Sequence, residues 1–299
     1  MNTSARIDVR PLNVTSPNRL GALRAATFTL VGGTICTLAG VNGSGKSTRF
    51  KTVMAFLGLA LGAAALPAQI TEWTTTVKPG RFLLEVDAIS LSIDREPGLK
   101  YTAFGAASTF LTTGLTANWD IQVGANFFLS QKFDAAGLTE RQSGVGDMYV
   151  RTKWRFYEST DTYTSFAVLP YIKFPTNSGG VGNDAVEGGV IFPFQTQLTG
   201  GFNFAAMGKL DLLRNDNDDG YDTYWFASAS VGRHILKAIG IYGEATMAKS
   251  SGGAPGEGTM GVGATLEISE HAWWDYAIYR GVSSGATDWN HVLRFNYSF

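Results

Sequence analysis

The sequence predicts an all-β protein, a transmembrane antiparallel up-and-down β-barrel of about 12 strands. The first observation is that apolar and polar residues alternate with a period of two over repeated segments in residues 69–299. The second is composition: 36 glycines and 16% charged residues are unusual for a soluble enzyme, and a mean hydropathy of +0.01 is too polar for membrane-spanning helices. The third is an alternating C-terminal segment that ends on an aromatic residue.

Net charge divides the chain into two unlike parts. Residues 1–68 contain seven Lys or Arg and one acid, a net charge of +6, whereas residues 69–299 contain 17 basic and 24 acidic residues, a net charge of −7. The single cysteine, Cys36, is in the first part. A second part without thiols suits export through an oxidising compartment. We therefore predict that residues 1–50 and 51–68 are distinct from the barrel.

Residues 1–50 contain a complete phosphate-binding loop pattern, G-V-N-G-S-G-K-S, from Gly40 to Ser47. It lies between an apolar strand candidate, residues 34–39, and a helix candidate that starts at Lys46. In this layout the backbone N–H groups of the loop surround a phosphate, the lysine supplies a cation and the serine can hold Mg²⁺. The pattern predicts a short α/β fragment ahead of the barrel.

The stretch LRAATFTLVGGTICTLAGVNGSGKSTRFKTVMAFL resembles the opening of ABC transporter ATP-binding subunits, particularly metal-ion importers. The resemblance covers about residues 6–57 and implies nucleotide contacts for Gly40, Gly45, Lys46, Ser47 and Thr48. The sequence has no LSGGQ-like signature and no apolar strand that ends in the metal-holding Asp-Glu pair, both of which that family needs for phosphoryl transfer. We therefore predict a truncated, inactive fragment, joined to the barrel by recombination or by a wrongly assigned start.

Residues 53–66, VMAFLGLALGAAAL, form the stretch with the apolar density of a membrane segment. At 14 residues it is too short to span about 30 Å of hydrocarbon as a helix. Two basic residues precede it and small residues follow it, as in a secretory signal. We predict a signal-like helix in residues 51–68, with cleavage after Ala65 or Ala68; a buried helix of a soluble domain is the alternative.

Residues 147–157 illustrate the alternation that predicts the barrel. Trp154 and Phe156 fall on one face, whereas Lys153 and Tyr157 fall on the other. In a transmembrane barrel the apolar face contacts lipid and the polar face lines the lumen, and the sheet must close because an open edge would leave unpaired backbone groups in hydrocarbon. Segments of this kind begin near residues 81, 99, 117, 144, 162, 185, 200, 221, 239, 257, 272 and 287.

An even number of strands places both ends of the barrel on the periplasmic side. Connections after odd-numbered strands are then extracellular, and several of them are long and polar: residues 133–143, 175–184, 214–221 and 249–257. The connections at residues 198–200 and 237–238 are tight, as periplasmic turns are. Residues 215–220, NDNDDG, partly match a calcium loop, but Phe226 stands where the loop needs Glu, so we expect a solvated loop and no metal.

The polar faces of these segments supply candidates for lining the lumen. They are Asp147, Tyr149, Arg151, Lys153, Arg155, Tyr171, Lys173, Glu187, Lys209, Asp211, Glu244 and Asp275. Two arrangements are open: an electrostatic lining of a narrow pore, or a plug of mutually paired structural charges. The three histidines are dispersed and none is placed beside a Ser or Asp as in a nucleophile arrangement, so we expect no catalytic residues and no enzyme activity.

At the chain end, apolar residues alternate with polar ones. They are Leu293, Phe295, Tyr297 and Phe299. This resembles the terminal signal of outer-membrane barrels that the barrel-insertion machinery reads. The segments GVGDMYVRTKWRF, LPYIKFPTNSGGVGNDAVEGGVIFPF and GKLDLLRNDNDDGYDTYWFASASVGR resemble the outer-membrane family of the MetA-pathway of phenol degradation, and the resemblance covers residues 69–299. It implies a barrel that passes or binds small, often hydrophobic or aromatic compounds.

We therefore expect a bacterial outer-membrane protein that passively conducts or binds small molecules without a cofactor. The expected partners are outer-membrane lipid and lipopolysaccharide, the barrel-assembly machinery and small solutes, with no nucleic acid. One alternative is an ATP-binding subunit of an ABC metal-ion transporter, supported by residues 40–48 alone. Another is a structural or adhesive barrel.

Overall fold

A computed structural model of the chain describes residues 6–15, 21–31, 69–96, 98–135, 138–215 and 220–299. Within these ranges no helix is long and apolar enough to cross a membrane. The predicted strand at residues 34–39, the predicted signal helix at residues 51–68 and four residues of the NDNDDG loop lie outside the described residues. So do the predicted nucleotide contacts Gly40, Gly45, Lys46, Ser47 and Thr48.

An antiparallel hairpin occupies the beginning of the chain. Its strands are β1 (Arg6–Thr15) and β2 (Gly21–Val31), with Arg6 opposite Val31 and Thr15 opposite Gly21. No strand was predicted at these residues, although Ile7 and Val9 alternate with Asp8 and Arg10.

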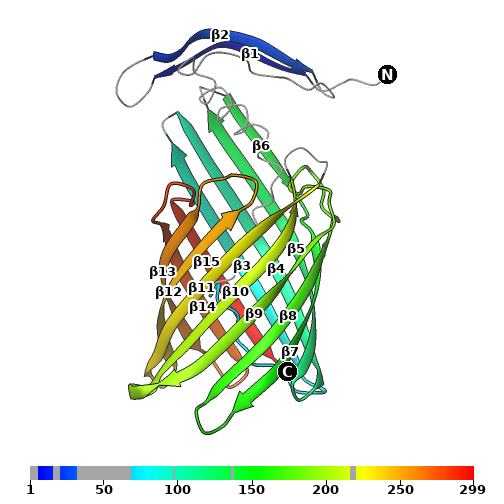
Figure 1. Cartoon of the computed structure of the whole chain (residues 1–299), viewed down its shortest axis with the longest axis vertical. Coiled ribbons are helices and arrows are strands. Elements are labelled where there is room, and N and C mark those ends of the chain that lie inside the picture. The colour runs from blue at the N-terminus through cyan, green and yellow to red at the C-terminus, as the bar shows by residue number, and fades with distance from the viewer. Residues whose placement is uncertain (1–5, 16–20, 32–68, 97, 136–137, 216–219) are drawn as a thin grey trace. The chain divides into compact units, whose positions relative to one another are not determined.

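Residues 82–298 form a closed antiparallel barrel of 12 strands (Figure 1). The strands are β3 (Phe82–Glu96), β4 (Leu99–Thr116), β5 (Trp119–Ala135), β7 (Met148–Ser159), β8 (Thr164–Phe174), β9 (Glu187–Leu198), β10 (Phe202–Arg214), β11 (Tyr221–Leu236), β12 (Ile239–Ser250), β13 (Glu257–Glu267), β14 (Ala272–Gly281) and β15 (Trp289–Ser298). Each strand pairs with the next, and the ring closes because β15 pairs with β3. The predicted up-and-down barrel is confirmed, and each of the 12 strands begins within four residues of its predicted start.

One predicted extracellular connection is largely strand instead. β5 continues to Ala135, and β6 (Leu138–Gly144) follows and pairs with β5 as an extension outside the closed ring. The sequence of β6, LTERQSG, is polar and mostly exposed, so it carries no alternating signal. Where both faces of a hairpin are wet, pairing with β5 can hold the strand without alternation, and the Thr139 hydroxyl also donates to Asp134 (2.6 Å).

The two ends of the barrel meet at one rim. The Phe82 N–H donates to the Phe299 carbonyl (2.8 Å), the Phe299 N–H donates to the Phe82 carbonyl (2.9 Å), and the two rings stack 5.4 Å apart.

The tight turn at Thr199–Gly201 uses two glycines with φ near +75°, at Gly200 and Gly201, where a side chain would be strained. Of the four C-terminal residues proposed as an insertion signal, Tyr297 and Phe299 are exposed and Leu293 and Phe295 are half-buried.

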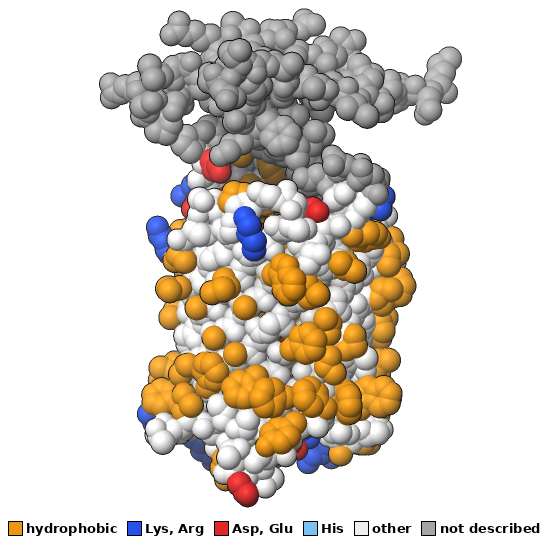
Figure 2. Space-filling view, viewed as in Figure 1, with side chains coloured by type: hydrophobic (Ala, Val, Ile, Leu, Met, Phe, Trp, Pro, Cys, Tyr) orange, Lys and Arg blue, Asp and Glu red, His pale blue; other side chains and the backbone are white. Residues whose placement is uncertain are grey.

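The outer wall of the barrel is apolar. Figure 2 shows hydrophobic side chains, many of them aromatic, spread over the wall in view, with charged side chains near its ends. Phe127, Trp225 and Met247 are among the exposed hydrophobic residues of the protein. Tyr157, predicted to face the lumen, is exposed instead, because the pairing of β7 with β8 shifts register between Arg155 and Tyr157 and reverses the alternation. The buried residues are largely polar, as expected for a barrel that turns its apolar face to lipid.

Candidate functional site

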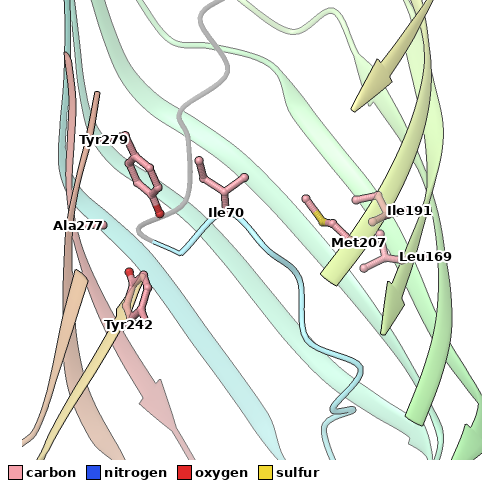
Figure 3. Packing of buried hydrophobic residues seen from close by; sticks show 7 residues of the cluster. All are labelled: Ile70, Leu169, Ile191, Met207, Tyr242, Ala277 and Tyr279. Atoms are coloured by element: carbon pink, nitrogen blue, oxygen red, sulfur yellow. The ribbon is translucent and has the colours of Figure 1, made fainter. Parts of the chain in front are cut away.

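Residues 69–80, which precede the first barrel strand, form an internal segment inside the lumen. Thr71 and Thr74 are almost fully buried there. Figure 3 shows Ile70 between the inward-facing Tyr279 and Ala277 on one side and Met207, Ile191 and Leu169 on the other. The sequence patterns missed this segment, because QITEWTTTVKPG has no periodicity and its place depends on contacts with strands far along the chain.

One end of the internal segment is held by Glu244 of β12. This carboxylate is 4% exposed and accepts the N–H groups of Ile70 (3.1 Å) and Thr71 (2.5 Å). It also accepts the hydroxyl groups of Thr71 and Tyr279, and the Thr71 hydroxyl is 2.7 Å from that of Ser228. Four donors therefore surround two carboxylate oxygens, which compensates the burial of this charge.

Further carboxylates project from β14 and β3. Asp275 of β14 accepts the Tyr242 hydroxyl at 2.9 Å. Asp87 and Glu85 of β3 both contact Arg294 of β15, with Nε 2.7 Å from Asp87 and Nη1 3.4 Å from Glu85. We call Glu85, Asp87, Glu244 and Asp275 the acidic wall. Glu244 and Asp275 are predicted lumen residues. Asp87, Glu85 and Arg294 are not, although each alternates with apolar neighbours.

The internal segment meets positive charge on β7. Glu72 Oε1 lies 2.8 Å from Nη2 of Arg151, and Glu72 Oε2 lies 3.5 Å from Nζ of Lys153. We call Arg151 and Lys153 the basic patch. Burial raises the pKa of the Glu72 carboxyl, but the charges of Arg151, Lys153 and Arg294 outweigh it and lower this pKa to about 2. Glu72 is therefore ionised at neutral pH.

Neighbouring strands hold the basic patch in place. Gln122 of β5 lies opposite Arg151 in the register, and its Oε1 accepts from Arg151 Nε at 2.7 Å. The Arg151 guanidinium lies 4.3 Å from the centre of the Phe110 ring, which is itself 6.1 Å from Tyr149. Phe110 can sit there because the facing residue on β5 is Gly124, where a Cβ would overlap the ring. Gln122 and Phe110 of the barrel strands thus orient the Arg151 guanidinium, and this orientation does not depend on the internal segment.

The remaining predicted lumen residues pair with one another. Lys173 lies 2.8 Å from Glu187 and 3.1 Å from Asp147. Asp211 lies 2.7 Å from Lys209 and accepts the Tyr171 hydroxyl at 2.6 Å. Arg155 contacts Glu158 (3.2 Å) and the Ala117 carbonyl (3.3 Å) at the rim, apart from the others. The structure therefore brings Arg151, Lys153 and Glu244 to the internal segment. The other charged side chains contact one another or nearby residues of the barrel strands.

Two observations bear on other kinds of site. Among the described residues, no group of three or more His, Cys, Asp or Glu side chains is arranged to hold a metal ion. His234 is exposed and lies 3.9 Å from Glu267, and His291 is 3.0 Å from the Tyr276 hydroxyl.

A family model described as Putative MetA-pathway of phenol degradation matches residues 69–299. The chain belongs to this family. Among solved structures, the COG4313 outer membrane channel from Pseudomonas putida F1 has a similar fold, with a TM-score of 0.59 and 13% identity over 76% of this chain and 98% of that one. The transport unit of the autotransporter AIDA-I from Escherichia coli is also similar, with a TM-score of 0.52 and 11% identity over 83% of this chain and 98% of that one.

Two curated proteins match over a short stretch. The chelated iron transport system membrane protein YfeB of Yersinia pestis is 49% identical over 55 residues, which are 18% of this chain and 19% of that protein. The manganese transport system ATP-binding protein MntA of Synechocystis is 49% identical over 57 residues, 18% of this chain and 22% of that protein. The chain thus spans about a fifth of the length of the curated relatives it matches.

The family, the closed barrel and its apolar wall place this protein in the bacterial outer membrane. The predicted location is confirmed. The protein is an outer-membrane barrel of the fold that channels use, with a polar lumen that contains a segment of its own chain.

Proposed function

We propose that this member of the family is a passive outer-membrane channel for small solutes, narrowed by the internal segment. The observation that carries the proposal is the position of residues 69–80 between walls of opposite charge. Glu244 holds the segment on one side, and Arg151 and Lys153 contact it on the other. A solute that passes the segment would move between fixed charges of opposite sign, which orient dipolar and charged molecules.

The proposed solutes are small and include aromatic compounds. Phe110 and Tyr149, both half-buried, lie beside the basic patch. Such rings give an apolar solute favourable contacts inside an otherwise polar lumen. Transport would involve no chemical step and no cofactor.

The proposed partners follow from the outer wall and the chain end. The exposed aromatic residues of the wall would contact outer-membrane lipid and lipopolysaccharide. Leu293, Phe295, Tyr297 and Phe299 would be read by the barrel-assembly machinery before the barrel closes, since Phe82 and Phe299 are paired in the folded state. Replacing Phe299 by Ala would then reduce the amount of folded protein in the outer membrane.

Solute flux tests the channel proposal. The full chain is expressed, the protein is isolated from outer membranes, and liposomes that contain it are placed in isotonic solutions of small solutes. We expect liposomes with the protein to swell faster than liposomes without it in glycerol and in pentose sugars, and to remain unchanged in oligosaccharides. Equal swelling with and without the protein, together with no ionic conductance in planar bilayers, would instead support a structural or adhesive barrel.

A further inference from the structure

We infer that the basic patch is a binding site for the carboxylate of a small aromatic monocarboxylate, and that Glu72 occupies this site in the absence of solute. The inference rests on the proposed channel function and names one class of solute for it. It depends on four features: two cations placed for one carboxylate, a carboxylate that comes from the internal segment, rings beside it, and acids across the lumen.

The two cations are placed for a single carboxylate group. Arg151 and Lys153 are two residues apart on β7, so their side chains project to the same face of the strand. Each binds a different oxygen of Glu72, at 2.8 Å and 3.5 Å. Arg151 Nε donates to Gln122 Oε1, while Nη2 of the same guanidinium contacts Glu72. Such a pair recognises a carboxylate from a solute as well as one from the chain.

Glu72 can leave the patch while the internal segment stays in place. The rest of the segment is anchored through backbone N–H groups: Thr71 donates to Glu244 (2.5 Å), Thr74 to Gln195 (3.1 Å) and Val77 to Asp120 (3.1 Å). These three contacts do not involve the Glu72 side chain. An incoming carboxylate therefore replaces one ion pair with another of the same kind. Because a tethered group competes at an effective concentration of about millimolar, the solute binds weakly and can leave again.

The surroundings select the rest of the solute. The Phe110 ring lies against the guanidinium at 4.3 Å and Tyr149 lies next to it, so an aromatic ring attached to the bound carboxylate has ring faces to pack on. Across the ring of strands, Glu244 and Asp275 of the acidic wall would repel a second carboxylate. These features favour a solute that has one negative charge and one aromatic ring.

The test compares benzoate with two partial analogues on protein isolated from outer membranes after expression of the full chain. Acetate has the charge without the ring, and benzyl alcohol has the ring without the charge. Single-channel current in chloride is recorded as each solute is added, and calorimetry on the same samples in detergent measures binding directly. We expect benzoate to bind and to reduce the current, acetate to do so more weakly, and benzyl alcohol to have no saturable effect.

Substitutions assign the effect to the patch. Glu72→Gln removes the internal competitor, so benzoate affinity rises by about tenfold or more. Glu270→Gln, the same change at an exposed turn between β13 and β14, leaves the affinity at the wild-type value. Arg151→Gln abolishes the benzoate effect and Arg151→Lys retains part of it, while the heat-modifiable mobility of both variants in gels reports that the barrel is folded.

Two results would overturn the inference: equal benzoate affinity in the wild type and Glu72→Gln, or a benzyl alcohol affinity that matches that of benzoate. Failure of the channel proposal looks different. In that case no variant conducts ions, yet calorimetry still measures the benzoate affinities and their dependence on Glu72 and Arg151.

Discussion

Glu244 on the acidic wall accepts two backbone N–H groups of the internal segment. In the basic patch, Arg151 contacts the segment through the Glu72 side chain, and Lys153 contacts both Glu72 and the Thr75 carbonyl (3.4 Å). A backbone contact holds the path of the chain whatever residue is present. A side-chain contact can break and form again while that path is unchanged. The comparison indicates that the acidic wall positions the segment and that the basic patch provides the exchangeable contact.

The two regions also differ in how their charges are balanced. The acidic wall has four carboxylates, and Arg294 is the cation that contacts two of them, Asp87 and Glu85. The basic patch has two cations and receives its carboxylate from the segment. Removing Arg294 therefore leaves two carboxylates of the barrel without their cation. Removing the Glu72 carboxylate instead makes the basic patch available to a solute.

The largest expected effect is that of Arg294→Gln. This change leaves Asp87 and Glu85 without their cation at the β3–β15 pairing that closes the barrel. Breaking a buried ion pair by removing one partner costs about 3–5 kcal/mol. We expect a lower urea midpoint for unfolding in detergent micelles, measured by tryptophan fluorescence. Arg155→Gln is the matched control, because its partner Glu158 is half exposed and such pairs contribute about 1 kcal/mol or less. Equal midpoints for the two variants would contradict the comparison.

A smaller effect is expected from Glu244→Ala, which removes the anchor and keeps the barrel. The N–H groups of Ile70 and Thr71 lose their acceptor, and each unsatisfied donor costs about 1–3 kcal/mol where water does not replace it. We expect faster hydrogen exchange at these two amides and a severalfold higher single-channel conductance.

Glu257→Ala provides the control for that variant, since Glu257 is a half-buried acid of β13 whose partner is the Tyr224 hydroxyl. Its conductance should match that of the wild type. If Glu244→Ala also conducts as the wild type does, the acidic wall does not position the segment.

The sequence predicted the barrel because the pattern is local. Lipid on one side and water on the other impose alternation along each strand, so Arg151, Lys153 and Glu244 could be assigned to the lumen one strand at a time. The prediction was wrong at Tyr157, where a bulge of one residue reverses the faces and no local feature marks it.

The internal segment could not be predicted in this way. Its residues contact β5, β7, β8, β9, β11 and β12, so its path follows from the assembled ring and not from its own periodicity. The pairing of lumen charges has the same origin. Lys173 could have met any inward acid, and the register of β8 with β9, which places it opposite Glu187, determines its partner.

Gly114→Ala tests the base of the internal segment. An added Cβ would lie 2.2 Å from the Val77 carbonyl oxygen and 2.5 Å from the Lys78 carbonyl carbon, both of them backbone atoms that cannot rotate away. Overpacking of this kind costs about 1–3 kcal/mol. We expect residues 77–78 to shift, and exchange at the Val77 amide, which donates to Asp120, to become faster. Gly208→Ala is the control, because a Cβ there meets nothing within 4 Å, and it should leave that exchange rate unchanged.

The smallest effect is expected from protonation of Glu72 in acid. The pKa of Glu72 is lowered to about 2 in the folded protein from 4.5 for the free group, so its ion pairs contribute stability that is complete above the higher value and is lost as the pH falls towards the lower one. Protonation of Glu72 should therefore change the conductance only below about pH 4. The change should be smaller than that of Glu244→Ala, because the backbone anchors of the segment remain. Glu72→Gln should abolish the step near Glu72's pKa, and a wild-type step centred near neutral pH would show that another group controls the passage.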